Sequence, residues 1–207
     1  MLEPVLYSIL NKKKIVLASS SPRRKEVLKT VGLQFDVIPS QFDESSVPES
    51  KYADKRDYVL DLAEYKVMDV FDSLKNANNI PDLIIGADTI VELNNKIFGK
   101  PADKDQAVEY LKTLSGQTHT VHTAVVIKTL NKAKKFVEST RVTMAPLNVD
   151  TIKAYVETGD PLDKAGAYGI QCLGGSLIEK IEGDFYNVTG LPLHKFCLNL
   201  LSLLEEL

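Results

Sequence analysis

Two arginines directly follow a serine-rich turn near the start of the chain, in the sequence ASSSPRR of residues 18–24. The apolar residues before this turn predict a short strand, and Ser21 and Pro22 suit the N-cap and the first position of a helix. Arg23 and Arg24 then lie in the first helical turn, where each cation is unfavourable by about 0.3–1 kcal/mol. Helix N–H groups and two guanidinium groups together favour the binding of a phosphate-like anion. The alternatives are a solvated basic turn or a serine segment that is itself phosphorylated.

An aspartate interrupts the apolar run of residues 82–93, which predicts a buried strand. A carboxylate without a partner is costly in such a place, so Asp88 needs a cation or hydrogen-bond donors beside it. These surroundings are typical of a general base or a metal ligand. The alternative is a bulge at a strand end, marked by Gly86 and Asp88, in which the carboxylate accepts from local backbone amides.

Three further charged residues are candidates for the same chemistry. Lys66 lies at the edge of the apolar face of a helix predicted over residues 54–74, where a lysine more often extends into solvent. Lys100, in a Gly-Lys-Pro turn, is able to contact an anion as a point charge, or is a surface residue. Glu44 lies in an acidic loop beside Asp43, and one of these acids is a candidate ligand for a metal that bridges phosphates. The alternative for this loop is a pair of solvated acids.

A glycine-rich stretch, residues 159–190, contains the sequence AGAYGIQ, which ends at Gln171. Small residues let a ligand approach the backbone closely, and the Gln171 amide offers both donors and acceptors. A tight structural turn accounts equally well for the glycines.

The histidines and cysteines predict neither a metal site nor thiol chemistry. His119 and His122 are three positions apart in a strand predicted over residues 118–129, so they point to opposite faces of the sheet. Cys172 and Cys197 have no partner spacing and no evident base beside them, which fits a reducing compartment.

Strand-like and helix-like patterns alternate along the chain, which predicts an α/β fold. A glycine at 32 and another at 116 predict where two of the helices end. The predicted strands are 15–18, 35–39, 82–93, 118–129 and 135–144, and helices begin near 22, 54, 103, 149 and 192.

Composition limits the class of protein. The 207 residues carry a formal net charge of −3, so no overall positive charge attracts nucleic acid. With 44% hydrophobic residues, the chain can form one globular domain over residues 1–207. The N-terminal pattern does not fit a signal peptide, and no apolar run approaches membrane length. These features predict a cytoplasmic protein that binds neither nucleic acid nor a membrane.

Six segments, in this order, resemble the Maf family of nucleoside triphosphate pyrophosphatases. They are LASSSPRR (17–24), GADTIV (86–91), GKP (99–101), LSGQTH (114–119), AGAYGIQ (165–171) and YNVTGLP (186–192). The resemblance implies an elongated mixed β-sheet flanked by helices, with two lobes around a central cleft. It also implies a homodimer.

The resemblance further implies hydrolysis of a nucleoside triphosphate between its α and β phosphates, which releases a monophosphate and pyrophosphate. Asp88 is then the general base that activates water, and Glu44 helps to bind a divalent cation, Mg²⁺ or Mn²⁺. The residues that hold the triphosphate are Ser19, Arg23, Arg24, Lys66 and Lys100.

Three positions distinguish branches of this family by base preference. Arg23, Thr89 and Gln171 resemble the dTTP/UTP branch of house-cleaning enzymes, as opposed to the branch that acts on 7-methyl-GTP. Three alternatives stand beside this one: a nucleotide sensor without turnover, a pyrophosphatase for deaminated purine nucleotides, and a phosphoprotein-binding module.

Overall fold

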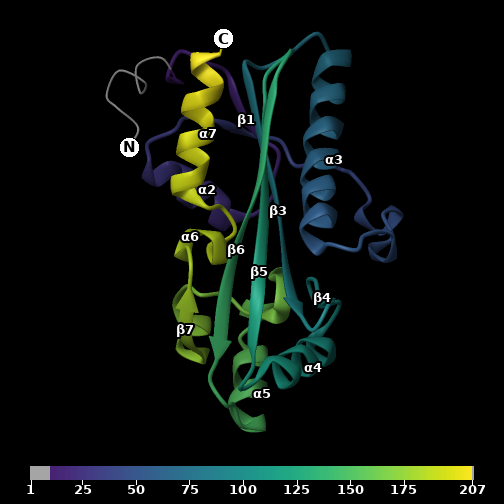
Figure 1. The fold of residues 1–207 in the computed structure, drawn as a ribbon, viewed down its shortest axis with the longest axis vertical. Helices are drawn as coiled ribbons and strands as arrows, with labels where there is room; N and C mark the ends of the chain where they lie inside the picture. The colour runs from purple at the N-terminus through teal and green to yellow at the C-terminus, as the bar shows by residue number, and fades with distance from the viewer. Residues whose placement is uncertain (1–9, 207) are drawn as a thin grey trace. The chain divides into compact units, whose positions relative to one another are not determined.

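The computed structural model describes residues 10–206, apart from the side chain of Cys172, and contains a mixed β-sheet with helices packed against it (Figure 1). The described part has seven strands in the order β2-β1-β3-β5-β6-β7, with β4 paired to β3. β1 is parallel to both β2 and β3, whereas β4 is antiparallel to β3 and β7 to β6. The predicted mixed α/β fold is therefore confirmed. The strands are β1 (Ile15–Leu17), β2 (Asp36–Val37), β3 (Leu83–Leu93), β4 (Lys96–Phe98), β5 (Thr118–Lys128), β6 (Ala133–Met144) and β7 (Ile178–Glu182).

The helices begin where the sequence places their caps. Asp54 accepts a hydrogen bond from the Arg56 amide before the longest helix, and Asp103 accepts one from the Gln106 amide before another. Gly32 follows the first helix with a φ of 69°. The α-helices are α2 (Pro22–Thr30), α3 (Lys55–Asn76), α4 (Lys104–Leu114), α5 (Val149–Glu157), α6 (Phe185–Thr189) and α7 (Leu193–Glu205). Short 3₁₀ helices are η1 (Glu44–Ser46), η2 (Glu49–Lys51), η3 (Asp160–Asp163), η4 (Ala165–Ala167) and η5 (Cys172–Leu177).

Two compact units make up the chain, and unit 1 comprises residues up to Asp88, Thr123–Val137 and the residues from Gly190 onward. In this unit, α2 and α7 cover one face of β1 and β3, and α3 covers the other (Figure 1). Alternate residues of a strand share a face, so Leu17 and Ile85 join the core beneath α2 and α7. The opposite face, beneath α3, is the one that carries Gly86.

Unit 2 comprises Thr89–His122 and Glu138–Thr189. Its core is a separate cluster in which Phe98 and Leu111 pack with Met144 and Tyr168. In β5, the Nε2 atom of His119 lies 2.6 Å from the hydroxyl of Tyr168.

The two histidines of β5 have different partners, as the strand period predicts. The His122 ring nitrogens lie 2.8 Å from Ser139 Oγ and 3.0 Å from Glu92 Oε2, whereas His119 contacts Tyr168. These contacts agree with the prediction that the two side chains point away from each other.

The strand predicted over residues 35–39 is shorter than expected. Only Asp36 and Val37 form the strand, and both are exposed. β2 is an edge strand that pairs with β1, whose own three residues leave few partners for a longer strand. No helix among residues 10–206 is both long enough and apolar enough to cross a membrane.

Candidate active site

Asp88 lies in the interior of β3, and its carboxylate contacts the ammonium group of Lys66. The distance from Lys66 Nζ to Asp88 Oδ1 is 2.7 Å, and the side chains are 14% and 12% exposed, respectively. β1 pairs with β3 only as far as Ile85, so β3 extends past the end of β1 where Asp88 lies. The strand continues past this residue to Leu93, so Asp88 does not mark the end of a strand. The carboxylate has the cation that its burial requires.

Lys66 reaches Asp88 because α3 packs very close to β3. A Cβ atom at Gly86 would lie 2.2 Å from Cγ2 of Val67, the residue next to Lys66. Gly86 and Asp88 are two positions apart and therefore face the same helix. The interpretation in which Lys66 extends into solvent is wrong, since its ammonium group is held against the sheet.

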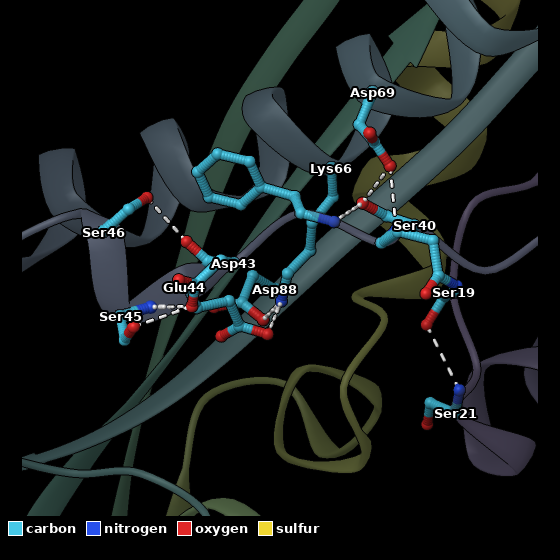
Figure 2. Close-up of polar contacts among 12 residues, drawn as sticks. Ser19, Ser21, Ser40, Asp43, Glu44, Ser45, Ser46, Lys66, Asp69 and Asp88 are labelled. Atoms are coloured by element: carbon cyan, nitrogen blue, oxygen red, sulfur yellow. Dashed lines mark hydrogen bonds and ion pairs between the residues drawn. The ribbon is translucent and has the colours of Figure 1, made fainter.

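A second carboxylate meets the same ammonium group, because Lys66 Nζ also lies 2.7 Å from Glu44 Oε1 (Figure 2). Glu44 is the first residue of η1, and its side chain is 50% exposed. The neighbouring Asp43 has a different role. Its Oδ1 atom accepts from the Ser45 amide at 3.0 Å and from the Ser45 hydroxyl at 2.7 Å, which caps η1. Of the two acids, Glu44 is the one that contacts Lys66.

Arg24 is buried and linked to Ser19. Its Nε donates to the Gly190 carbonyl at 2.9 Å, and its Nη1 donates to Ser19 Oγ at 3.0 Å. Burial lowers the pKa of Arg24, whereas the carboxylates of Asp88 and Glu44 raise it. The charges of both acids therefore act on the guanidinium group of Arg24. Arg23 precedes it in the first turn of α2, as the sequence predicts, and is half-buried.

Tyr58 was not among the predicted site residues, yet it belongs to the same surroundings. Burial raises the pKa of its hydroxyl, and the charges of Asp88, Glu44 and Glu49 raise it further. Tyr58 precedes Lys66 by eight positions on α3, and this spacing places both on one face of the helix. That spacing was the signal that could have identified it.

Three predicted residues belong to unit 2. Thr89 follows Asp88 in β3 and is half-buried, while Lys100 is exposed in the turn after β4. Gln171 is half-buried at the N-cap of η5. Their part in a common site stays a prediction.

The glycines near Gln171 allow close packing of the backbone. A Cβ atom at Gly169 would lie 2.8 Å from Cε of Lys164, and one at Gly174 would lie 2.1 Å from the Gly169 carbonyl oxygen. Lys164 is itself buried and lies 3.0 Å from Asp160 Oδ1. The structural account of these glycines is therefore supported by the packing.

The donor set of the site suits a magnesium-type ion that is shared with a ligand. Among residues 10–206, no three Asp, Glu, His or Cys side chains gather closely enough to hold a metal by themselves. Mg²⁺ is usually bound by one or two carboxylates, with phosphate oxygens and water completing the shell. Asp88 and Glu44, which already share one cation in Lys66, fit that pattern.

Comparisons with known proteins agree with these motifs. The family model described as "Maf-like protein" matches residues 14–203. A human protein named "Probable bifunctional dTTP/UTP pyrophosphatase/methyltransferase protein" is 41% identical over 97% of this chain, which spans 33% of that protein. A Clostridium botulinum protein named "dTTP/UTP pyrophosphatase" is 47% identical over 88% of this chain and 93% of its own length.

Among solved structures, the Staphylococcus aureus Ham1 protein aligns over 94% of this chain and 98% of its own, with 16% identity and a TM-score of 0.47. The family model covers most of this chain, and the match to the Clostridium botulinum protein covers most of both chains. This chain therefore belongs to the Maf-like protein family.

Proposed function

We propose that this protein is a nucleoside triphosphate pyrophosphatase that hydrolyses dTTP and UTP to the monophosphate and pyrophosphate. The observation that carries the proposal is the single ammonium group of Lys66 held between two carboxylates, Asp88 and Glu44. Relatives named for the same activity match most of the chain at 47% and 43% identity. The family and the chemistry of the site thus support one function.

Positively charged side chains and hydrogen-bond donors would hold the triphosphate. Catalysis of phosphoryl transfer depends mostly on such positioning and on stabilisation of negative charge. Ser19 Oγ accepts from Arg24 Nη1 and from the Ser21 amide, at 3.0 and 3.3 Å. A hydroxyl has two lone pairs and one proton, so its own O–H is left to donate to an anion. The N-terminus of α2 adds further N–H groups beside it.

Asp88 would act as the general base. Its carboxylate takes a proton from a water molecule while the water oxygen attacks a phosphorus atom of the α–β anhydride. A new P–O bond forms and the anhydride P–O bond breaks, which gives the monophosphate and pyrophosphate. Lys66 fixes the position of the carboxylate through the 2.7 Å contact.

Asp88 and Glu44 would hold Mg²⁺ or Mn²⁺ together with phosphate oxygens. When bound, the ion supplies positive charge that offsets the charge of the triphosphate. The two carboxylates converge on one cation in the present structure, which supports this assignment.

Base selection would rest on Arg23, Thr89 and Gln171. Uracil and thymine present two carbonyl acceptors and one N–H donor, and a glutamine amide can both donate and accept. A hydrophobic pocket alone could not distinguish these bases from cytosine, whereas paired donors and acceptors can.

The test is pyrophosphate release from dTTP, UTP, CTP, ITP and 7-methyl-GTP with Mg²⁺ or Mn²⁺, by the natural chain and by Asp88→Asn. Selective cleavage of dTTP and UTP by the natural chain alone would support both the reaction and the specificity. A preference for ITP or 7-methyl-GTP would overturn the specificity. Binding of nucleotide without release of pyrophosphate would favour a sensor and overturn the proposed reaction.

A further inference from the structure

We propose that Asp69 and Ser40 are positioning residues, which fix the acidic segment 40–46 on α3 so that Glu44 reaches the metal-binding position. This inference rests on the metal-binding role that the proposed function gives to Glu44. Asp69 lies on α3 three positions after Lys66, so one helix carries both the partner of Glu44 and the anchor of its segment.

The anchor is a single carboxylate oxygen that accepts two hydrogen bonds. Asp69 Oδ2 lies 2.8 Å from Ser40 Oγ and 2.8 Å from the backbone amide of Gln41 (Figure 2). Ser40 Oγ in turn accepts from the Phe42 amide at 3.0 Å. The Ser40 side chain and the backbone amides of Gln41 and Phe42 are thereby held, immediately before the acids.

Aromatic packing adds a second attachment to the same helix. The rings of Phe42 and Tyr65 have centroids 5.1 Å apart. Beyond this point, Asp43 caps η1 and closes the short turn that presents Glu44. The segment is thus tied to α3 through Asp69, Tyr65 and Lys66.

Burial does little to hold the segment in place. Residues 43–46 are all exposed, so their position depends on local polar contacts more than on a hydrophobic core. Charge-assisted hydrogen bonds to a carboxylate are about twice as strong as neutral ones. Loss of the Asp69 carboxylate would therefore release the segment before it disturbed the rest of the unit.

The position of Glu44 matters because a metal-binding carboxylate must be oriented before the ion arrives. Mutation of the outer hydrogen-bond partners of metal ligands typically costs about 10–100-fold in metal affinity or activity. We expect Asp69→Ala to raise the Mg²⁺ concentration for half-maximal pyrophosphate release about tenfold. At saturating Mg²⁺, kcat should stay within about twofold of the natural value, because Asp69 does not touch the reacting atoms.

The experiment measures hydrogen exchange at residues 41–46 and the Mg²⁺ dependence of turnover in four variants. Asp69→Ala and Ser40→Ala should both speed exchange at the Gln41 and Phe42 amides. Asp69→Asn should restore most of the protection, since its side-chain oxygen can accept the same two hydrogen bonds. Asp72→Ala, which changes an exposed aspartate of the same helix, should behave as the natural chain.

The outcomes separate this inference from the proposed function. Unchanged exchange in Asp69→Ala and Ser40→Ala would overturn the anchor, as would faster exchange with natural Mg²⁺ dependence. Should the natural chain release no pyrophosphate, the proposed function fails, and Mn²⁺ binding measured by electron paramagnetic resonance with α,β-methylene-dUTP takes the place of turnover. In that case, equal Mn²⁺ affinity in Asp69→Ala and the natural chain would overturn the inference, and weaker affinity would support it.

Discussion

The ammonium group of Lys66 and the carboxylate of Asp88 form an ion pair at 2.7 Å in which both side chains are largely shielded from water. Removal of one partner from a buried pair typically destabilises a protein by about 3–5 kcal/mol, because the other charge is left uncompensated. Partial exposure of both groups places the expected value near the lower end of that range.

Lys66→Met should therefore lower the free energy of unfolding by about 3 kcal/mol, as measured by urea denaturation. The double variant Lys66→Met/Asp88→Asn should regain much of this loss, since no unpaired charge is left at the strand. Additive effects of the two substitutions would contradict a direct coupling between these residues.

Neighbouring acids provide a matched pair of variants. Glu44→Gln should raise the Mg²⁺ concentration that half-maximal turnover requires, because it removes a charged oxygen from the metal-binding position. Asp43→Asn should leave that concentration nearly unchanged, since asparagine also caps a helix well. The reverse order of effects would assign the metal to Asp43.

Gly86→Ala should disturb the packing of α3 on β3, and with it the contact between Lys66 and Asp88. The added Cβ would meet Val67 Cγ2 at 2.2 Å, which forces α3 away from β3 and carries Lys66 with it. Overpacking of this kind costs about 1–3 kcal/mol, and activity should fall with it. Gly99→Ala is the control for stability, because no heavy atom outside residues 98–100 lies within 4 Å of its added Cβ. Thermal unfolding of both variants tests the contrast.

His119 should make stability fall with acidity. Burial lowers the pKa of its imidazole to about 4, whereas an unfolded histidine has a pKa near 6.5. Below pH 6.5, His119 binds a proton in the unfolded chain, whereas in the folded chain it stays neutral down to about pH 4. The contribution of His119 to the free energy of unfolding is therefore complete above pH 6.5 and decreases as the pH falls from 6.5 to about 4.

His119→Gln should remove this part of the pH dependence while it keeps a polar group beside the hydroxyl of Tyr168 in the core. Urea denaturation at several values between pH 4 and 7 measures the slope. An unchanged slope in His119→Gln would show that other groups cause the dependence.

Sequence reasoning identified residues whose own type and neighbours are informative. Asp88 stands out in an apolar strand, and Arg24 stands out in the first turn of a helix, so each signals that a partner must exist. The cap at Asp54 and the end of α2 near Gly32 were also predictable, since these signals lie within a few residues of the element.

Contacts between distant segments were not predictable in the same way. The position of Lys66 on its helix fits solvent exposure as well as contact with Asp88, and the distance between α3 and β3 decides between them. That distance depends on the absence of a side chain at Gly86. Asp69 gave no signal at all, because its partner Ser40 is determined by how the intervening chain folds back onto α3.

Most of the contacts that position the site come from one helix, α3. Tyr65, Lys66 and Asp69 of α3 hold the acidic segment, and Lys66 also holds the base. A misplacement of about 1 Å can reduce catalysis about 100-fold. Since Lys66 contacts both carboxylates, a displacement of α3 would disturb its contacts with Asp88 and with Glu44 together. Activity should therefore depend on how α3 packs against β3. On heating, we expect activity and this packing to be lost at the same temperature.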